Sequence, residues 1–223
     1  MSAPLFTTSL RPSENTVREP ESILPAMVPA LNFPPELLLR AQGVKIAFFD
    51  VDGVLTDGGL YFSEYPDGHE RAGTLGGFRS AGEIIKRFNT LDGHGLKLLQ
   101  KVGITPVVIT GRDSPVLRAR LQSLGITHSH FGTEDKRPAA ELALQALGLD
   151  WSAAAAMGDD WPDLPVMSRA ALSCAPANAH TEVRARAHHV TQASGGHGAA
   201  REFCDLLLVA SGRYASLLRD YTE

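Results

Sequence analysis

Two aspartates separated by one residue, Asp50 and Asp52, are the side chains of this sequence best placed to do chemistry. They follow an apolar run at 44–49 that contains one lysine and is typical of a buried parallel strand. Two carboxylates this close repel each other unless a cation or a basic side chain lies between them. Because ligands bind where the strands of an α/β sheet end, we predict that one carboxylate attacks phosphorus beside a cation.

Three further segments place polar groups where a strand should end or a helix should begin. A Thr-Gly-Arg triplet, Thr110–Arg112, follows an apolar run, Lys136 opens a helical pattern, and Gly158–Asp160 follows another apolar run with Asp163 close behind. Taken singly, each has an ordinary explanation: a chance triplet, a solvated lysine, or a turn. The Asp-x-Asp-Gly segment alone also fits a Ca²⁺-type loop or a capped turn. Four such segments in this order indicate one shared phosphate site.

The pattern around these segments predicts an α/β fold with a doubly wound parallel sheet. Short apolar runs alternate with helical periods, which is typical of parallel strands joined by helices. Strands are expected at 44–49, 105–109, 126–131, 153–157, 172–174 and 190, and helices at 35–40, 115–124, 136–147, 180–187 and 198–209. Proline and glycine mark several of the helix ends.

One region departs from this alternation. Residues 60–62 and 84–88 resemble two strands of a β-hairpin insertion, which we place at about 59–89, with a long glycine-rich loop between the strands. A loop of this length is usually functional or mobile. Residues 1–34 are rich in proline and are expected to form an extended or disordered arm. We therefore divide the chain into this arm, a domain at 35–212 and a tail at 213–223.

Composition narrows the class of protein. The chain has 223 residues, 43% of them hydrophobic and 21% charged, as in globular proteins of one domain. A net charge of −4 gives no electrostatic case for a nucleic-acid partner. No apolar run is long enough to span a bilayer, and the N-terminus lacks a signal-peptide pattern, so we expect no membrane partner and a cytoplasmic enzyme. Cys174 and Cys204 are expected to be buried free thiols rather than a disulfide.

With these motifs in place, the chain resembles the haloacid dehalogenase superfamily of phosphotransferases. Within it, the chain is similar to the family of 3-deoxy-D-manno-octulosonate 8-phosphate phosphatases. The resemblance covers about residues 36–212 and rests on six segments: DVDGVLTDG at 50–58, FN-x-x-DG-x-G at 88–95, ITGR at 109–112, Lys136, GDDWPDLPVM at 158–167 and GGHGAAREFCDLLL at 195–208. It implies a Mg²⁺-dependent phosphomonoesterase that acts on a phosphorylated 3-deoxy-2-ulosonic sugar acid in lipopolysaccharide biosynthesis.

The resemblance agrees with the roles expected from the residue types. Asp50 would be the nucleophile that takes the phosphoryl group, and Asp52 the acid that protonates the leaving oxygen and then activates water. Mg²⁺ would be held by Asp50, the backbone carbonyl of Asp52, and Asp159. Asp160 or Asp163 would orient these ligands. Lys136 would neutralise charge on the phosphoryl group and on Asp50.

The substrate-binding residues follow from the same resemblance. Thr110 and the amide of Gly111 would hold phosphate oxygens, with Arg112 beside them. Little room remains for a cap domain, so we expect a capless enzyme. The resemblance implies a homotetramer formed through the hairpins.

The chain also departs from the family pattern. Relatives usually have arginine at the positions of Leu91 and His197, where a guanidinium could bind a substrate carboxylate. Arg79, Arg87 or Arg201 could replace them, and His94 and His197 are candidate substrate contacts or plain loop histidines. The alternatives to the eight-carbon substrate are a nine-carbon ulosonate 9-phosphate, another sugar phosphate, or a non-catalytic oligomerisation module.

Overall fold

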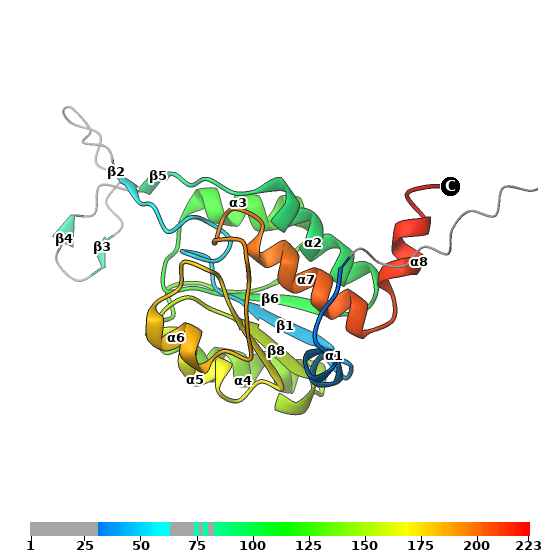
Figure 1. Ribbon diagram of the computed structural model, residues 1–223. Helices are drawn as coiled ribbons and strands as arrows, with labels where there is room; N and C mark the ends of the chain where they lie inside the picture. Colours follow the sequence, from blue (N-terminus) through cyan, green and yellow to red (C-terminus); the bar gives the residue numbers. More distant parts are fainter. Residues whose placement is uncertain (1–30, 63–73, 76–77, 80–82) are drawn as a thin grey trace, which may run out of the picture.

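A six-stranded parallel sheet forms the centre of the protein (Figure 1). The structure is a computed structural model that describes residues 31–62, 74–75, 78–79 and 83–223. The strands lie in the order β10-β9-β8-β1-β6-β7. Their bounds are β1 Ile46–Phe49, β6 Thr105–Ile109, β7 His128–His130, β8 Ala154–Met157, β9 Leu172–Ala175 and β10 His189–Val190. The predicted doubly wound parallel sheet is confirmed.

Helices cover both faces of this sheet, because its strands are buried on both sides. Ala47 and Phe49 of β1 pack in the core on the side of α1, α2, α3 and α7, while Ile46 and Phe48 pack on the side of α4, α5 and α6. The bounds are α1 Pro35–Ala41, α2 Thr90–Lys101, α3 Pro115–Leu124, α4 Lys136–Leu147, α5 Leu164–Met167, α6 Thr181–Arg186 and α7 Ala199–Ala210. Single-turn 3₁₀ helices lie at Trp151–Ala153 and Trp161–Asp163.

Local signals fixed the ends of α3 and α4 as predicted. The Ser114 hydroxyl accepts the amide of Leu117, and Gly125 ends α3 in the left-handed region with φ +71°. Asp135 caps α4, and Gly148 ends it with φ +64°. Lys136 is therefore the first residue of its helix and lies at the edge of the sheet where the strands end.

Helix α2 was not among the predicted helices, and its glycines are the reason. Gly93 and Gly95 lie inside Thr90–Lys101, where glycine disfavours a helix. A Cβ on Gly93 would lie 2.3 Å from Nη2 of Arg120, and one on Gly95 would lie 3.0 Å from Cβ of Cys204. The two glycines thus let α2 pack closely against α3 and α7, and this tertiary packing outweighs their low helix propensity.

The insertion between β1 and α2 consists of short antiparallel pairs in the described residues. Strand β2 (Tyr61–Phe62) pairs with β5 (Glu83–Ile85), and β3 (Thr74–Leu75) pairs with β4 (Phe78–Arg79). The prediction of a second strand at 84–88 was wrong in its bounds, because the chain leaves β2 after Ile85 and directs Lys86 towards Asp52.

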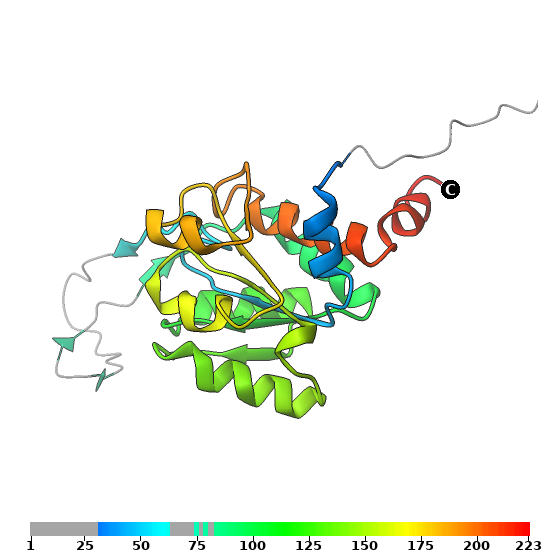
Figure 2. The ribbon, with the colours of Figure 1, turned by 60° about the horizontal axis from the view of Figure 1, so that its bottom comes forward.

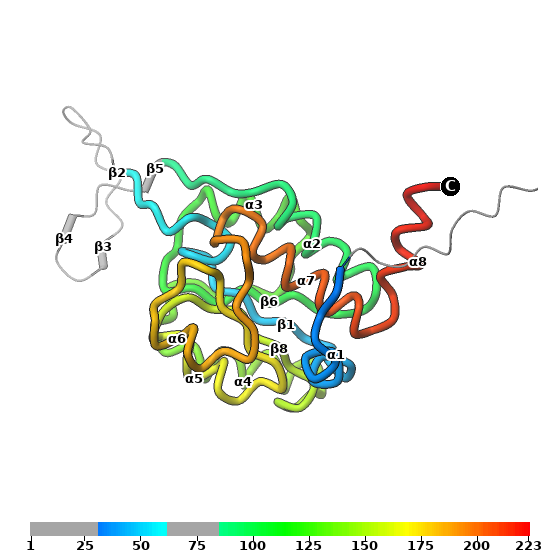
Figure 3. Tube along the Cα trace, in the orientation of Figure 1, coloured from blue at the N-terminus to red at the C-terminus, as the bar shows by residue number. Residues whose placement is uncertain are grey.

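The pair β2–β5 projects from the body of the protein, at the end opposite helix α8 (Figures 2 and 3). In the described part of 57–89 there is no helix, which agrees with a capless fold. Most of the predicted arm and of the long glycine-rich loop lies outside the described residues.

The tail at 213–223 contains helix α8, Tyr214–Arg219. Leu217 is buried in the core, and the Tyr221 ring lies edge-on to His94 with 5.7 Å between ring centroids. Cys174 and Cys204 are buried free thiols, as predicted. Among the helices that the structure describes, none is both long and apolar enough to cross a membrane.

Candidate active site

The carboxylate of Asp50 lies at the end of β1 in a buried ionic group. Lys136 Nζ donates to Asp50 Oδ1 at 2.5 Å and to Asp163 Oδ1 at 2.6 Å. All three side chains are less than 10% exposed. Burial, followed by the charge of Asp163, raises the pKa of Asp50 to about 6, although Lys136 opposes this change. Burial alone would lower the pKa of Lys136, but the two carboxylates outweigh it and raise that pKa.

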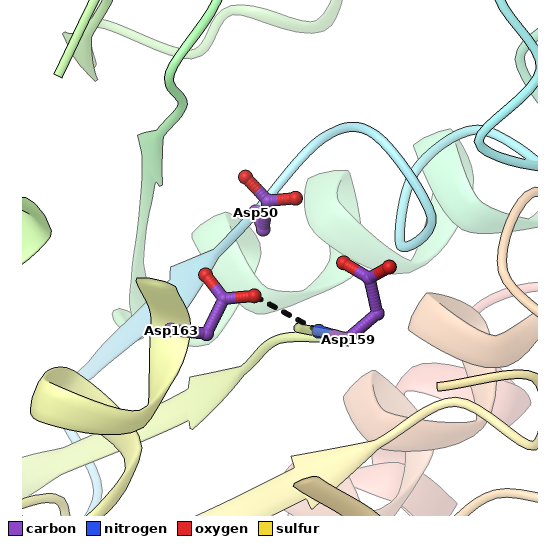
Figure 4. A group of neighbouring side chains, drawn as sticks. All are labelled: Asp50, Asp159 and Asp163. Atoms are coloured by element: carbon purple, nitrogen blue, oxygen red, sulfur yellow. Dashed lines mark hydrogen bonds between the residues drawn. The ribbon is translucent and has the colours of Figure 1, made fainter. Parts of the chain in front are cut away.

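The loop after β8 is built around Asp163. Oδ2 of Asp163 accepts the amides of Asp159 at 2.9 Å and of Asp160 at 3.2 Å, and the first of these bonds is drawn in Figure 4. Glycine is required at position 158, since a Cβ there would lie 2.2 Å from Cβ of Asp163. The Asp160 side chain instead caps the following 3₁₀ helix. Of the two residues expected to orient the site, Asp163 makes the contacts with Lys136 and the loop.

The arrangement of three carboxylates fits a divalent cation. Ligand atoms of Asp50, Asp159 and Asp163 lie within 4.8 Å of one another, and Figure 4 shows the three side chains as neighbours, Asp50 at the end of β1, Asp159 in the loop after β8 and Asp163 on the following helical turn. Both oxygens of Asp163 already accept N–H groups, and Asp50 and Asp159 stay the predicted carboxylate ligands of the metal. Burial, together with the charges of Asp50 and Asp163, raises the pKa of Asp159 to about 8. A cation would remove this repulsion, and a hard cation such as Mg²⁺ prefers such oxygen ligands.

Gly53 keeps the space beside Asp159 open. Its φ of +93° is in the left-handed region, and a Cβ there would lie 2.1 Å from Asp159 Oδ2. The glycine that follows the two aspartates therefore lets the loop after β1 approach the loop after β8. The carbonyl of Asp52, which lies in this loop, stays a predicted metal ligand.

Asp52 contacts two basic side chains, Lys86 and Arg112. Its carboxylate forms an ion pair with Lys86, whose side chain is 1% exposed, and Oδ2 lies 3.5 Å from Nε of Arg112. Sequence reasoning missed Lys86. The available signal was a lysine directly after the apolar pair Ile84–Ile85, in a segment expected to be a strand of the insertion. Lys86 holds Asp52 in place from the insertion, and Arg112 does so from the loop after β6.

Thr110 and Gly111 follow β6, which is hydrogen-bonded to β1, so they lie beside Asp50 at the same edge of the sheet. Thr110 is buried, and its hydroxyl accepts the amide of Arg112 at 3.2 Å. Gly111 is exposed, and a Cβ there would meet nothing within 4 Å. An amide of an exposed residue beside a hydroxyl, near an Asp50 carboxylate that is paired with Lys136, is suited to binding phosphate oxygens.

A tight turn before α7 closes against the loop that carries the two aspartates. A Cβ on Gly195 would lie 1.7 Å from the carbonyl oxygen of Gly53, and one on Gly196 would lie 2.5 Å from the amide of Asp57. The buried carboxylate of Asp92, in α2, accepts the amides of Gly198 and Arg201 at 3.3 and 2.9 Å. This anchorage places His197 at the rim of the site.

The two candidate histidines lie in different surroundings. His197 Nε2 is 2.8 Å from Nη1 of Arg87, which also lies 3.5 Å from Oδ2 of Asp57 in the aspartate loop. His94 instead packs against Tyr221 of the C-terminal segment. Burial, aided by the positive charge of Arg201, lowers its pKa. Among the described residues, no recorded contact joins His94 to the acidic group.

Comparison with known proteins places this site in a family. Residues 131–203 match the model of haloacid dehalogenase-like hydrolases. The 3-deoxy-D-manno-octulosonate 8-phosphate phosphatase of Yersinia pestis is 37% identical over 178 residues, which cover 80% of this chain and 87% of that protein.

Two solved structures are similar throughout the domain. A probable phosphatase of Pseudomonas syringae has a TM-score of 0.76 and 44% identity, covering 85% of this chain and 99% of that one. The enzyme of Moraxella catarrhalis, solved with magnesium, phosphate and KDO, has a TM-score of 0.74 and 32% identity, covering 83% and 98%. On these similarities, the chain belongs to the 3-deoxy-D-manno-octulosonate 8-phosphate phosphatase family of haloacid dehalogenase-like hydrolases.

Proposed function

We propose that the protein hydrolyses 3-deoxy-D-manno-octulosonate 8-phosphate (KDO 8-phosphate) to the free sugar acid and phosphate. The observation that carries this proposal is the buried group of Asp50, Lys136 and Asp163 beside Asp159, in a chain 37% identical to the Yersinia pestis enzyme. Mg²⁺, which was bound in the Moraxella catarrhalis enzyme, is the cofactor that this acidic group fits.

Asp50 is the nucleophile. Its position at the end of β1 directs the carboxylate towards the edge of the sheet where Thr110 and Gly111 offer a hydroxyl and an amide to the phosphate. An oxygen of Asp50 forms a bond to phosphorus as the bond to the sugar oxygen breaks, giving an aspartyl phosphate. Lys136 stabilises the charge of the phosphoryl oxygens. When bound by Asp50, Asp159 and the carbonyl of Asp52, Mg²⁺ supplies further positive charge at this position.

Asp52 moves the proton. It protonates the leaving sugar oxygen in the first step and takes a proton from water in the second, when water attacks the aspartyl phosphate and Asp50 is released. Lys86 and Arg112 orient its carboxylate through the contacts described above. Because catalysis depends on placing these charges, removal of one should reduce the rate by orders of magnitude.

The assembly that completes the site is proposed to be a homotetramer formed through the insertions. Leu60, Tyr61 and Ile85 on and beside the projecting β2–β5 pair are 37%, 50% and 58% exposed. Apolar side chains on a projecting strand pair favour burial against a second copy of the chain. Light scattering tests this proposal, and a monomer at working concentration would remove it. A cytoplasmic location is part of the same proposal.

The test of function is a panel of phosphate monoesters assayed with Mg²⁺ and with EDTA. KDO 8-phosphate is expected to give the highest kcat/KM, and activity should vanish with EDTA. A nine-carbon ulosonate 9-phosphate is the alternative substrate and is included in the panel. Asp50→Asn should abolish hydrolysis and leave the oligomer intact. If the wild type shows no activity on the eight-carbon phosphate, the proposed substrate is wrong. If no phosphate is hydrolysed, the result favours the alternative, a non-catalytic oligomerisation module.

A further inference from the structure

Arg87 lies at the rim of the site with part of its guanidinium uncommitted. The side chain is 53% exposed, and its contacts with other described residues, to His197 and Asp57, both involve Nη1. The Nε and Nη2 groups make none with the described part of the chain. These two N–H donors lie side by side on one edge of a guanidinium, which is the geometry that binds a carboxylate through two parallel hydrogen bonds.

His197 holds Arg87 as a neutral acceptor. Its Nδ1 is 2.9 Å from the carbonyl oxygen of Gly195, which can only accept, so Nδ1 carries the proton. In the neutral ring Nε2 then accepts, and it faces Nη1 of Arg87 at 2.8 Å. A guanidinium held mainly by a neutral ring keeps its charge available. The carboxylate of Asp57 pairs with the same Nη1 group at 3.5 Å, so this ion pair leaves Nε and Nη2 able to bind a second carboxylate.

The location of this pair suits the far end of the substrate. Arg87 follows Lys86, which pairs with Asp52, and its own Nη1 lies 3.5 Å from Oδ2 of Asp57 in the loop that carries the two aspartates. The turn that carries His197 is fixed on the aspartate loop by the amide of Gly196, which donates to the carbonyl of Val54 at 3.0 Å. The pair therefore lies beside the leaving-group side of the site and outside the buried phosphate end.

We propose that Arg87 binds the carboxylate of the sugar acid and that His197 is a positioning residue that orients Arg87. This inference rests on the proposed function and names the group that distinguishes a sugar acid from a plain sugar phosphate. In KDO 8-phosphate the carboxylate and the phosphate lie at opposite ends of the carbon chain, so the carboxylate needs a cation at the rim. Arg201, the other described arginine near the turn, donates to Asp205 at 2.8 Å and is already paired.

The test compares two substrates, KDO 8-phosphate and arabinose 5-phosphate, which has a phosphate and no carboxylate. Arg87→Ala should raise KM for the sugar acid roughly 10- to 100-fold with kcat nearly unchanged, since a charge-assisted bidentate contact made equally in ground and transition states is lost. Its kcat/KM for arabinose 5-phosphate should stay within about twofold of wild type. Arg186→Ala, which removes an arginine 58% exposed on α6, is the matched control and should change neither value.

The role of His197 is tested by a double-mutant cycle. His197→Ala should raise KM for the sugar acid by a smaller factor than Arg87→Ala, and the double variant should match Arg87→Ala alone. If His197 had only a structural role, His197→Ala would instead lower kcat/KM for both substrates, and this loss would add to that of Arg87→Ala. Circular dichroism and thermal melting confirm that each variant folds.

Two results would overturn the inference: Arg87→Ala lowers kcat/KM equally for both substrates, or it lowers kcat/KM for neither. If the wild type prefers a different phosphorylated sugar acid, the proposed substrate fails, and the same comparison with that acid decides the role of Arg87. If the wild type hydrolyses only phosphates without a carboxylate, both proposals fail.

Discussion

The repulsion among the carboxylates of the proposed metal site predicts that the metal-free protein loses stability as pH rises. The folded state holds a proton on Asp159, whose pKa is raised to about 8, while the unfolded chain has released it near 3.8. Where the folded state binds more protons than the unfolded state, the free energy of unfolding falls with rising pH. From about pH 7 to pH 8.5, loss of this one proton should lower the free energy of unfolding by roughly 1 kcal/mol.

Between about pH 7 and pH 8.5, the contribution of Asp159 to the pH dependence of stability can be distinguished from that of other groups. Asp50, with a pKa near 6, has largely released its proton at the lower end. His94 and His188 have lowered pKa values, so their contribution has the opposite sign, and most of it is complete below neutral pH. Asp159→Asn cannot titrate, and comparison with this variant cancels whatever the remaining groups contribute.

The assay is urea unfolding followed by circular dichroism, at both pH values, in EDTA and in saturating Mg²⁺. In EDTA, wild type should lose stability relative to Asp159→Asn as pH rises. In Mg²⁺ the loss should disappear, because the cation holds the carboxylates ionised and stabilises the folded state. Equal pH dependence of wild type and Asp159→Asn in EDTA would refute this account of the acidic group.

Three substitutions test other parts of the site. Lys136→Met leaves Asp50 and Asp163 buried without their cation. The free energy of unfolding in urea should fall by roughly 3–5 kcal/mol, and kcat should fall at least about 10²-fold. Near-normal values of both would contradict the central role of this lysine. Asp52→Asn should reduce kcat for a sugar phosphate by roughly 10²–10⁴-fold. The rate at which p-nitrophenyl phosphate forms the phosphoenzyme should fall much less, because its leaving group needs no proton. Equal reductions of the two rates would argue against an acid role of Asp52. Gly53→Ala puts a methyl group 2.1 Å from Asp159 Oδ2. The affinity for Mg²⁺, measured by calorimetry, should therefore fall at least about tenfold. An unchanged affinity would exclude Asp159 as a ligand.

The sheet and the core of the site were predictable because their signals are local. Asp50, Lys136 and Asp159 each lie directly at an element end that short apolar runs and capping residues define. In a parallel sheet the carboxyl ends of neighbouring strands meet, so sequence order alone brings these residues together.

The other features of the fold and site depend on tertiary contacts, which local sequence patterns do not reveal. Helix α2 carries two glycines whose value appears only when α3 and α7 pack against them. The pairing of Lys86 with Asp52 joins positions 34 residues apart across the insertion. The contact of His94 with Tyr221 joins helix α2 to the C-terminal segment, and the role of His94 as a substrate contact stays a prediction. The tail gave no strong helical signal, and α8 is held by burial of Leu217.

The most direct test of the account is a crystal structure of the protein with Mg²⁺ and beryllium fluoride, which mimics a phosphoryl group on a carboxylate. The account predicts that beryllium is bonded to a carboxylate oxygen of Asp50, with Lys136 and Thr110 in contact with the fluorides and Mg²⁺ between Asp50 and Asp159. An adduct on Asp52, Asp159 or any other residue would contradict it.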